Sequence, residues 1–183
     1  MHAYAYAILA AGLVAWAIPF FAAKRIGEAA GQVDRRARWG ILLQAVAFSV
    51  LWQARFWESP LPAWRTALSI LFLVLACVLS WTARRALGRQ WRLDAGLSAD
   101  HELVTSGPYG LVRHPIYTSM LCLLWGNGFL IAPWPLFLVA TVVFLIGTGI
   151  RVRAEDRLLA ARFGAQFKDY RRRVGAFIPF LKR

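Results

Sequence analysis

The chain is poor in acidic residues, in charge and in cysteine. Its 183 residues include nine Asp and Glu against 22 Lys and Arg, and only 17% of residues are charged, whereas about a quarter is usual for a soluble domain. The two cysteines, Cys77 and Cys122, lie in apolar segments, which argues against a disulfide framework. The three histidines and two cysteines form no cluster with metal-ligand spacing, so we predict no metal site.

Motifs of soluble nucleotide-binding enzymes are also missing. We find no P-loop and no strand–GxGxxG–helix unit; Gly126-x-Gly128 and Gly147-x-Gly149 lie in apolar segments, where glycine permits close helix packing. The net charge of +13 is typical of a nucleic-acid binder. The arginines, however, lie between apolar segments rather than along one polar face, so we predict no nucleic-acid partner.

Apolar residues are abundant, at 59% of the chain. A membrane-spanning helix needs roughly 20 mostly apolar residues. Five segments approach that length, of which the short second one is the weakest candidate: 4–23, 39–54, 64–83, 116–131 and 134–150. We therefore predict an all-α integral membrane protein with about five transmembrane helices in one domain, residues 1–183, with the lipid bilayer as its partner.

The basic residues predict the orientation of these helices. Twenty of the 22 Lys and Arg lie in segments 24–38, 84–113 and 151–183, and only Arg55 and Arg65 lie on the other side. The positive-inside rule then places the N-terminus outside and the C-terminus in the cytosol. The Ala- and Arg-rich composition is compatible with a prokaryote, in which case the inner cell membrane is expected.

The chain divides into three N-terminal spans, 1–85, and a cofactor-binding core, 86–183. The core begins with a polar cytosolic loop, followed by a helical hairpin, 116–150, whose helices are joined by Ala132-Pro133. In the tail, apolar residues recur at spacings of four, four and three: Leu159, Phe163, Phe167 and Tyr170. This pattern predicts a cytosolic amphipathic helix on the membrane surface, which does not exclude a second role as the wall of a cofactor pocket.

The stretch from His101 to Tyr117 has more functional side chains than a loop requires. Gly107-Pro108 indicates a turn, and Pro115 suits the first turn of the fourth span. Arg113 and His114 are thus expected at the helix entrance, with Tyr117 about one turn inside. A turn and a helix cap explain the prolines, but not two histidines and two tyrosines in one short stretch.

A second polar group begins where the last span ends. Arg151 and Glu155 are four residues apart, so they share one face of a continuing helix. An ordinary ion pair at this spacing is the purely structural alternative, and it contributes about 0.2–0.5 kcal/mol.

Residues 87–179 resemble the isoprenylcysteine carboxyl methyltransferase family, which are membrane-embedded enzymes that use S-adenosylmethionine. The resemblance rests on Leu87-Gly88-Arg89-Gln90-Trp91, His101-x-Leu103-Val104-Thr105-x-Gly107-Pro108-Tyr109, Arg113-His114-Pro115-x-Tyr117, Arg151 with Glu155-Asp156-x-Leu158, Phe163-Gly164 and Ile178-Pro179. The order and the spacing of these motifs both match.

The resemblance implies a cytosolic pocket for S-adenosylmethionine. The cofactor-binding residues would be His101, Glu102, Leu103, Val104, Tyr109, His114, Pro115, Ile116, Tyr117 and Glu155. Glu155 would hold a polar or cationic part of the cofactor, and Arg151 would bind the substrate carboxylate, which makes these two the catalytic residues. Two positions depart from the family: Asp156 replaces a common Glu, and Asp94 stands near a position that often holds glutamine.

The expected activity is methyl transfer from S-adenosylmethionine to a lipophilic acceptor, most simply an isoprenylcysteine-type carboxylate. A carboxylate is already ionised and needs only a cation to hold it, which arginine does bidentately. Alternative acceptors are a phospholipid amine, which needs a base such as His114 or Glu155, and a thiol. Two other classes stay open: a membrane reductase using NADPH, because steroid and sterol reductases look similar in their final helices, and a non-catalytic protein whose basic tail binds anionic lipid.

Overall fold

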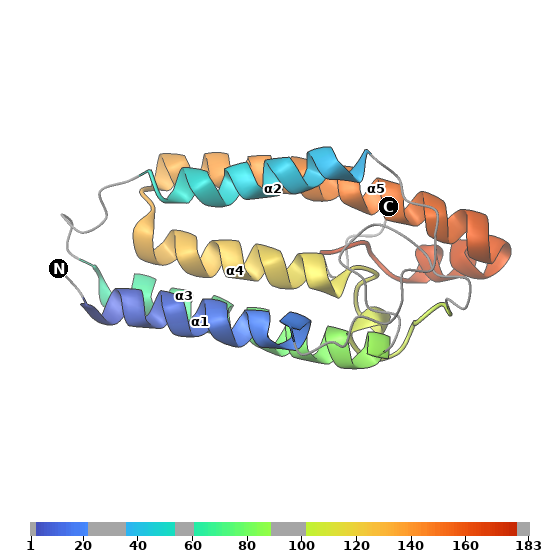
Figure 1. Ribbon diagram of the computed structural model, residues 1–183, viewed down its shortest axis with the longest axis horizontal. Helices are drawn as coiled ribbons and strands as arrows, with labels where there is room; N and C mark the ends of the chain where they lie inside the picture. Colours follow the sequence, from blue (N-terminus) through green and yellow to red (C-terminus); the bar gives the residue numbers. More distant parts are fainter. Residues whose placement is uncertain (1–2, 22–35, 54–60, 89–101, 179–183) are drawn as a thin grey trace.

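The computed structural model describes residues 3–21, 36–53, 61–88 and 102–178 (Figure 1). In chain order, the helices are α1 (Ala3–Phe21), α2 (Ala37–Leu51), α3 (Ala63–Leu87), the 3-10 helix η3 (Gly107–Gly110), α4 (Pro115–Ile131) and α5 (Trp134–Arg173). Within these residues, β-pairing is limited to one isolated parallel bridge between Val112 and Gly175. The predicted all-α class is confirmed.

The helices differ in whether their length suffices to cross a membrane. By length and composition α1, α3 and α5 are long and apolar enough to cross a membrane, whereas α2 and α4 are apolar but shorter, with 15 and 17 residues. At 1.5 Å per residue, α2 is only about 22 Å long. The count of five spans therefore stays a prediction, and α2 is again the weakest candidate.

The helices pack as two long pairs, with α3 along α4 and α2 along α5, while α1 lies against α3 (Figure 1). The buried residues of α2 recur every three or four positions: Ala37, Gly40, Gln44, Ala47 and Leu51. Such spacing presents one stripe to the protein. In contrast, α4 is buried on most of its circumference, because it packs along α3 and also contacts α1, α2 and α5. As predicted, α4 and α5 are joined by Ala132 and Pro133 alone.

Glycine permits close helix contact at three of the four predicted positions. A Cβ at Gly147 would lie 2.8 Å from the carbonyl oxygen of Gly40 on α2, and one at Gly126 would lie 2.8 Å from the side chain of Leu73 on α3. A Cβ at Gly128 would overlap the Phe137 ring. Gly149 is the exception, because a Cβ there would meet open space.

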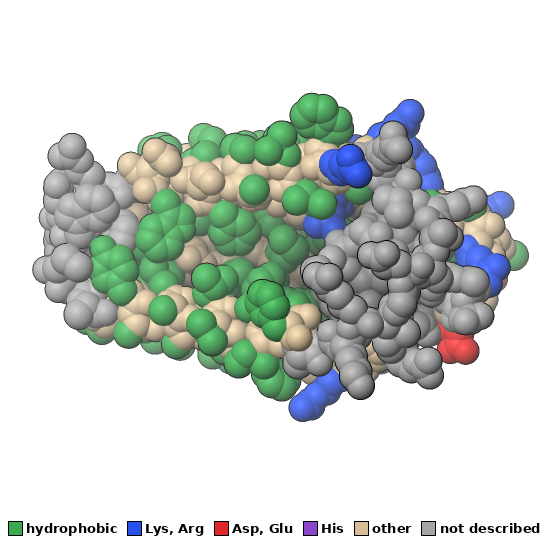
Figure 2. Space-filling view, viewed as in Figure 1, with side chains coloured by type: hydrophobic (Ala, Val, Ile, Leu, Met, Phe, Trp, Pro, Cys, Tyr) green, Lys and Arg blue, Asp and Glu red, His purple; other side chains and the backbone are tan. Residues whose placement is uncertain are grey.

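The outer surface separates apolar from basic side chains. Hydrophobic side chains cover the middle of the bundle, and Lys and Arg gather toward its right-hand end in Figure 2. The apolar surface includes exposed residues such as Leu71 and Val74 on α3 and Leu138 and Val142 on α5. Exposed side chains of this kind are expected to face lipid.

The end of α5 differs from the predicted surface helix. Gly164 has φ 50° and ψ −117°, a conformation that glycine adopts readily, and the last turns of α5 fold back toward the bundle (Figure 1). Phe167 and Tyr170 are therefore buried in the protein, at 1% and 3% exposure. The prediction that the whole apolar stripe rests on the membrane surface is wrong for these two residues.

Candidate active site

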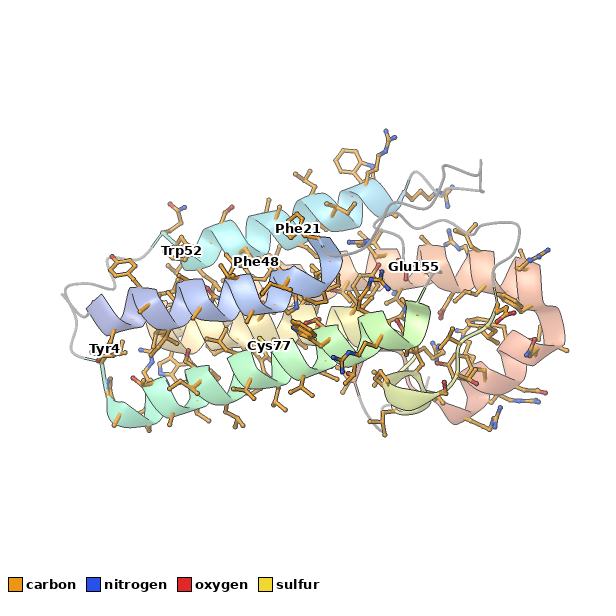
Figure 3. The ribbon with its side chains drawn as sticks, turned by 60° about the horizontal axis from the view of Figure 1, so that its bottom comes forward. Tyr4, Phe21, Phe48, Trp52, Cys77 and Glu155 are labelled. Carbon is orange, nitrogen blue, oxygen red and sulfur yellow. The ribbon has the colours of Figure 1, made fainter. Side chains whose placement is uncertain are left out.

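The site lies where α4 begins, beside the middle of α5. Figure 3 shows Glu155 on α5 toward the end of the bundle opposite Tyr4 and Trp52. The segment after α5 runs beside the start of α4: the amides of Arg113 and His114 donate to the carbonyls of Gly175 and Ala176, both at 2.8 Å. These bonds join the tail to the start of α4.

His114 is held between two carboxylates. It precedes Pro115, which occupies the first turn of α4 as predicted. Its Nδ1 lies 3.1 Å from Glu155 Oε2, and its Nε2 lies 2.9 Å from Asp156 Oδ1. Burial by itself lowers the pKa of His114, but the hydrogen bonds and charges of Asp156 and Glu155 outweigh it and raise this pKa to about 9. Near neutral pH His114 is therefore an imidazolium that donates from both nitrogens.

Asp156 joins His114 to a buried arginine. Arg113 Nη2 donates to Asp156 Oδ2 at 3.0 Å, and its Nη1 donates to the Val174 carbonyl at 2.5 Å. Burial acts to raise the pKa of Asp156, but His114 and Arg113 lower it overall, so the carboxylate stays ionised. Sequence reasoning placed Arg113 at the helix entrance but missed this link, for which Asp156 beside Glu155 was the available signal.

Tyr117 connects Glu155 with Arg151. Its hydroxyl donates to Glu155 Oε1, and the guanidinium carbon of Arg151 lies 4.9 Å from the centre of its ring, a cation–π contact. The i,i+4 spacing thus brings Arg151 and Glu155 to one face of α5, as predicted, with the same tyrosine against both. A positive and a negative group lie side by side.

Arg151 also contacts α2, a helix that sequence reasoning left out of the site. Its Nη1 donates to Gln44 Oε1 at 3.2 Å, and Gln44 Nε2 donates to Thr148 Oγ1 at 2.9 Å. The signal for Gln44 was an amide inside an apolar segment, since polar residues within spans are often functional.

The other predicted cofactor residues lie in the segment before η3 and in the first turn of α4. Leu103 and Val104 are half-buried and Glu102 is exposed, in the segment before η3. Pro115 and Ile116 form the first turn of α4. His101 and Asp94 lie outside the described residues.

Tyr109 lies in η3 and is buried. Its carbonyl accepts a hydrogen bond from the Tyr170 hydroxyl at 2.6 Å, so the folded-back end of α5 contacts the predicted pocket. Burial, and then the charges of Glu155 and Tyr170, raise the pKa of Tyr109. Glu155 is thus close enough to influence a residue of η3, and the predicted residues of separate motifs meet around it.

Glu155 has the capacity to bind a further group. Its side chain is 25% exposed, against 11% for Asp156. Its two oxygens accept from His114 and Tyr117, whereas a carboxylate offers about four lone-pair sites. Glu155 is thus an accessible carboxylate with Tyr117 bonded to it and Tyr109 near enough to be influenced by its charge. Such a site suits a cationic ligand that also carries polar groups.

Comparison with known proteins identifies the family and the fold. Residues 64–166 match the family model described as phospholipid methyltransferase. A solved structure of a eukaryotic intramembrane Ras methyltransferase, isoprenylcysteine carboxyl methyltransferase, has a TM-score of 0.64 and 24% identity, covering 95% of this chain and 63% of that one. This likeness shows the fold, and together with the apolar helices it makes the chain an integral membrane protein.

Three curated relatives show how widely the sequence is shared. The cobalt-zinc-cadmium resistance protein CzcN of Cupriavidus metallidurans is 31% identical, over 78% of this chain and 62% of its own length. Protein-S-isoprenylcysteine O-methyltransferase of Tribolium castaneum is 32% identical, over 65% and 43%. Methanethiol S-methyltransferase of Mycobacterium tuberculosis is 31% identical, over 78% and 63%. The chain thus covers less than two thirds of each relative.

Proposed function

The chain belongs to the phospholipid methyltransferase family, and from this premise we propose that it transfers a methyl group from S-adenosylmethionine to a lipophilic acceptor. The observation that carries the proposal is the placement of Arg151 and Glu155 one turn apart on α5, both against Tyr117. A cationic donor needs a negative neighbour and an anionic acceptor needs a positive one, and this face of α5 offers both.

Glu155, Tyr109 and Tyr117 would hold the donor, with the backbone of 102–104 beside them. When bound, S-adenosylmethionine would supply a methyl group on a positively charged sulfur; the acceptor oxygen would form the new C–O bond as the C–S bond breaks, and the electron pair would stay on sulfur. A carboxylate acceptor yields a neutral ester and releases no proton. Arg151 would orient that carboxylate without gripping it so tightly that its nucleophilicity falls.

The hydrogen bonds of the site favour an acceptor that is already ionised. An amine acceptor requires a base, and the sequence offered His114 or Glu155. His114 is protonated near neutral pH and donates to two carboxylates, while Glu155 accepts from His114 and Tyr117. We therefore propose an isoprenylcysteine-type carboxylate as the acceptor, with a thiolate as the second candidate, because a relative is named for methanethiol.

The membrane placement completes the proposal. We propose that the N-terminus lies outside and that the site faces the cytosol, because the basic residues 84–85, 113 and 151–173 share the end of the bundle where α4 begins. A lipophilic acceptor would then reach the site from the bilayer, with residues 86–183 as the cofactor-binding core.

Calorimetric titration of S-adenosylmethionine and of NADPH, separately, into detergent-purified protein tests the donor. We expect micromolar binding of S-adenosylmethionine alone, lost in Glu155→Ala and kept in Asp169→Asn, a control acid on the same helix that is 57% exposed. Binding of NADPH instead would support the reductase class. If neither ligand binds to folded protein, the methyltransferase proposal is wrong.

The acceptor is tested with S-adenosylmethionine labelled on its methyl group. N-acetyl-S-farnesylcysteine, methanethiol and phosphatidylethanolamine represent the carboxylate, thiol and amine classes. We expect label in a base-labile ester of the first. Label only in phosphatidylethanolamine would contradict the argument from His114.

A further inference from the structure

We propose that Gln44 on α2 is a positioning residue that orients Arg151 toward the acceptor. The inference rests on the proposed function and extends the site beyond residues 64–166, which match the family. Thus a helix with no recognisable motif would form one wall of the acceptor side.

Gln44 is an unusual residue for its surroundings. It is 3% exposed and lies in the middle of an apolar helix. Burying an amide is costly unless its hydrogen bonds are made. Both ends of this amide are satisfied by α5, at Arg151 and at Thr148. Gln44 is therefore built into the contact between the two helices.

The chemistry of arginine determines which way the amide points. A guanidinium only donates hydrogen bonds, so Gln44 must present its oxygen to Arg151. Its nitrogen then points to Thr148 Oγ1, which is fully buried and able to accept. Because Thr148 fixes the amide and the amide oxygen fixes Nη1, the guanidinium has a defined direction before any acceptor binds.

The packing of α2 against α5 reinforces this arrangement. A Cβ at Gly40 would overlap the Cγ of Arg151 and would lie 2.6 Å from the Gly147 carbonyl. Gly40 and Gln44 are one turn apart, so together they form the α2 side of the Arg151 site. The ring of Tyr117 on α4 lies on the guanidinium as well. A long side chain that otherwise has many rotamers is thereby restricted.

This geometry predicts an effect on methyl transfer rather than on donor binding. The two side-chain hydrogen bonds of Gln44 go to Arg151 and Thr148, not to the proposed donor residues Glu155, Tyr109 and Tyr117. Without Gln44, Arg151 keeps its charge but loses its orientation, and misplacement of a substrate-holding group lowers the rate.

The first experiment measures kcat, the KM for N-acetyl-S-farnesylcysteine and the Kd for S-adenosylmethionine in Gln44→Leu. We expect kcat/KM to fall about tenfold, as for a lost hydrogen bond to a charged group, with the Kd unchanged. Thr148→Val should have a smaller effect in the same direction. The matched control is Asn127→Leu, which removes another buried amide, bonded to the Leu123 carbonyl within α4, and should leave kcat/KM unchanged at temperatures where it is folded.

A double-mutant cycle shows whether Gln44 acts through Arg151. In an Arg151→Lys background, Gln44→Leu should reduce kcat/KM much less than in the wild type, because the oriented guanidinium is already gone. An equal reduction in both backgrounds, or a parallel loss of S-adenosylmethionine binding, would show a structural role and overturn the inference. Wild-type kinetics in Gln44→Leu would overturn this inference alone. Absence of methyl transfer by the wild-type protein to all three acceptor classes would instead overturn the proposed function, and this inference with it.

Discussion

The two ends of the bundle use arginine in different ways. At the end where α4 stops, Arg65 of α3 donates from Nε to the Phe129 carbonyl at 2.7 Å and from Nη2 to the Gly128 carbonyl at 3.3 Å and the Ala132 carbonyl. Its guanidinium also lies 5.9 Å from the ring centre of Trp134. The Gly128 carbonyl also accepts from the Ala132 amide, but the residue four positions after Phe129 is Pro133, which has no amide hydrogen to donate, so Arg65 acts as a C-terminal cap for α4.

At the opposite end, arginine contacts functional side chains. Arg113 pairs with Asp156, and Arg151 contacts Gln44 and Tyr117. A capping arginine needs only backbone carbonyls as partners. At this end the partners are side chains, and the two adjacent carboxylates Glu155 and Asp156 both contact His114. Thus a position near a helix end does not tell whether an arginine caps a helix or belongs to the site. Only the groups that it contacts decide this. The following experiments test this contrast.

The largest expected effect is that of Asp156→Ala on stability. The substitution leaves Arg113 and protonated His114 buried without their shared carboxylate, and breaking a buried pair in this way typically costs about 3–5 kcal/mol. Thermal unfolding in detergent should show a marked fall in Tm. The exposed Asp169→Asn variant serves as control, and an equal Tm for both variants would contradict the role given to Asp156.

Substitution of Arg151 should mainly reduce activity, whereas substitution of Arg65 should mainly reduce stability. Arg151→Ala should lower kcat/KM for the carboxylate acceptor by about 100-fold, because two charge-assisted hydrogen bonds to the acceptor are lost. Its Tm should fall less than that of Arg65→Ala, because the buried Gln44 oxygen loses one hydrogen bond whereas the end of α4 loses three. Arg65→Ala should lower Tm and leave kcat/KM unchanged at temperatures where it is folded. Steady-state kinetics and unfolding of both variants provide the comparison, and the reverse pattern would refute it.

The His114 cluster should make stability fall at alkaline pH. The pKa of His114 in the folded protein, about 9, lies above its ordinary value of 6.5, so the folded state binds the proton more tightly than the unfolded state. The stabilisation is fully present below about pH 6.5 and is lost as pH rises through about 9. Tm measured from pH 6 to 10 should decline over this window, and His114→Asn should flatten the curve. An unchanged slope in the variant would assign the decline to other groups.

The smallest effect is expected at Gly149, which makes it a control for Gly147. A Cβ at Gly147 would press against the backbone of α2 at Gly40 and Gln44, at 2.8 and 3.2 Å. Gly147→Ala should therefore displace α2 and lower both Tm and kcat/KM, by about 1–3 kcal/mol in stability. Gly149→Ala meets open space and should leave kcat/KM unchanged. Equal behaviour of the two variants would show that close contact of α2 and α5 does not matter.

The sequence by itself determined the helices and the local parts of the site. Runs of apolar residues predicted the five α-helices, because helix formation depends on neighbours along the chain. Pro115 and Pro133 predicted where α4 and α5 begin, and the spacing of Arg151 and Glu155 predicted their shared face. Such features depend on residues a few positions apart, so a single sequence is sufficient to reveal them.

Only the tertiary structure decided which helix faces meet. Gln44 and Arg151 are 107 positions apart, and Arg113 and Asp156 are 43 apart, so no local pattern relates them. The reversal at Gly164 likewise turned Phe167 and Tyr170 from the expected membrane surface into the protein, where the Tyr170 hydroxyl bonds the Tyr109 carbonyl. Apolar periodicity shows that a face is buried but not what buries it, because many apolar partners are equivalent. The specific partners follow from packing at Gly40 and Gly147 and from the need to satisfy each buried polar group.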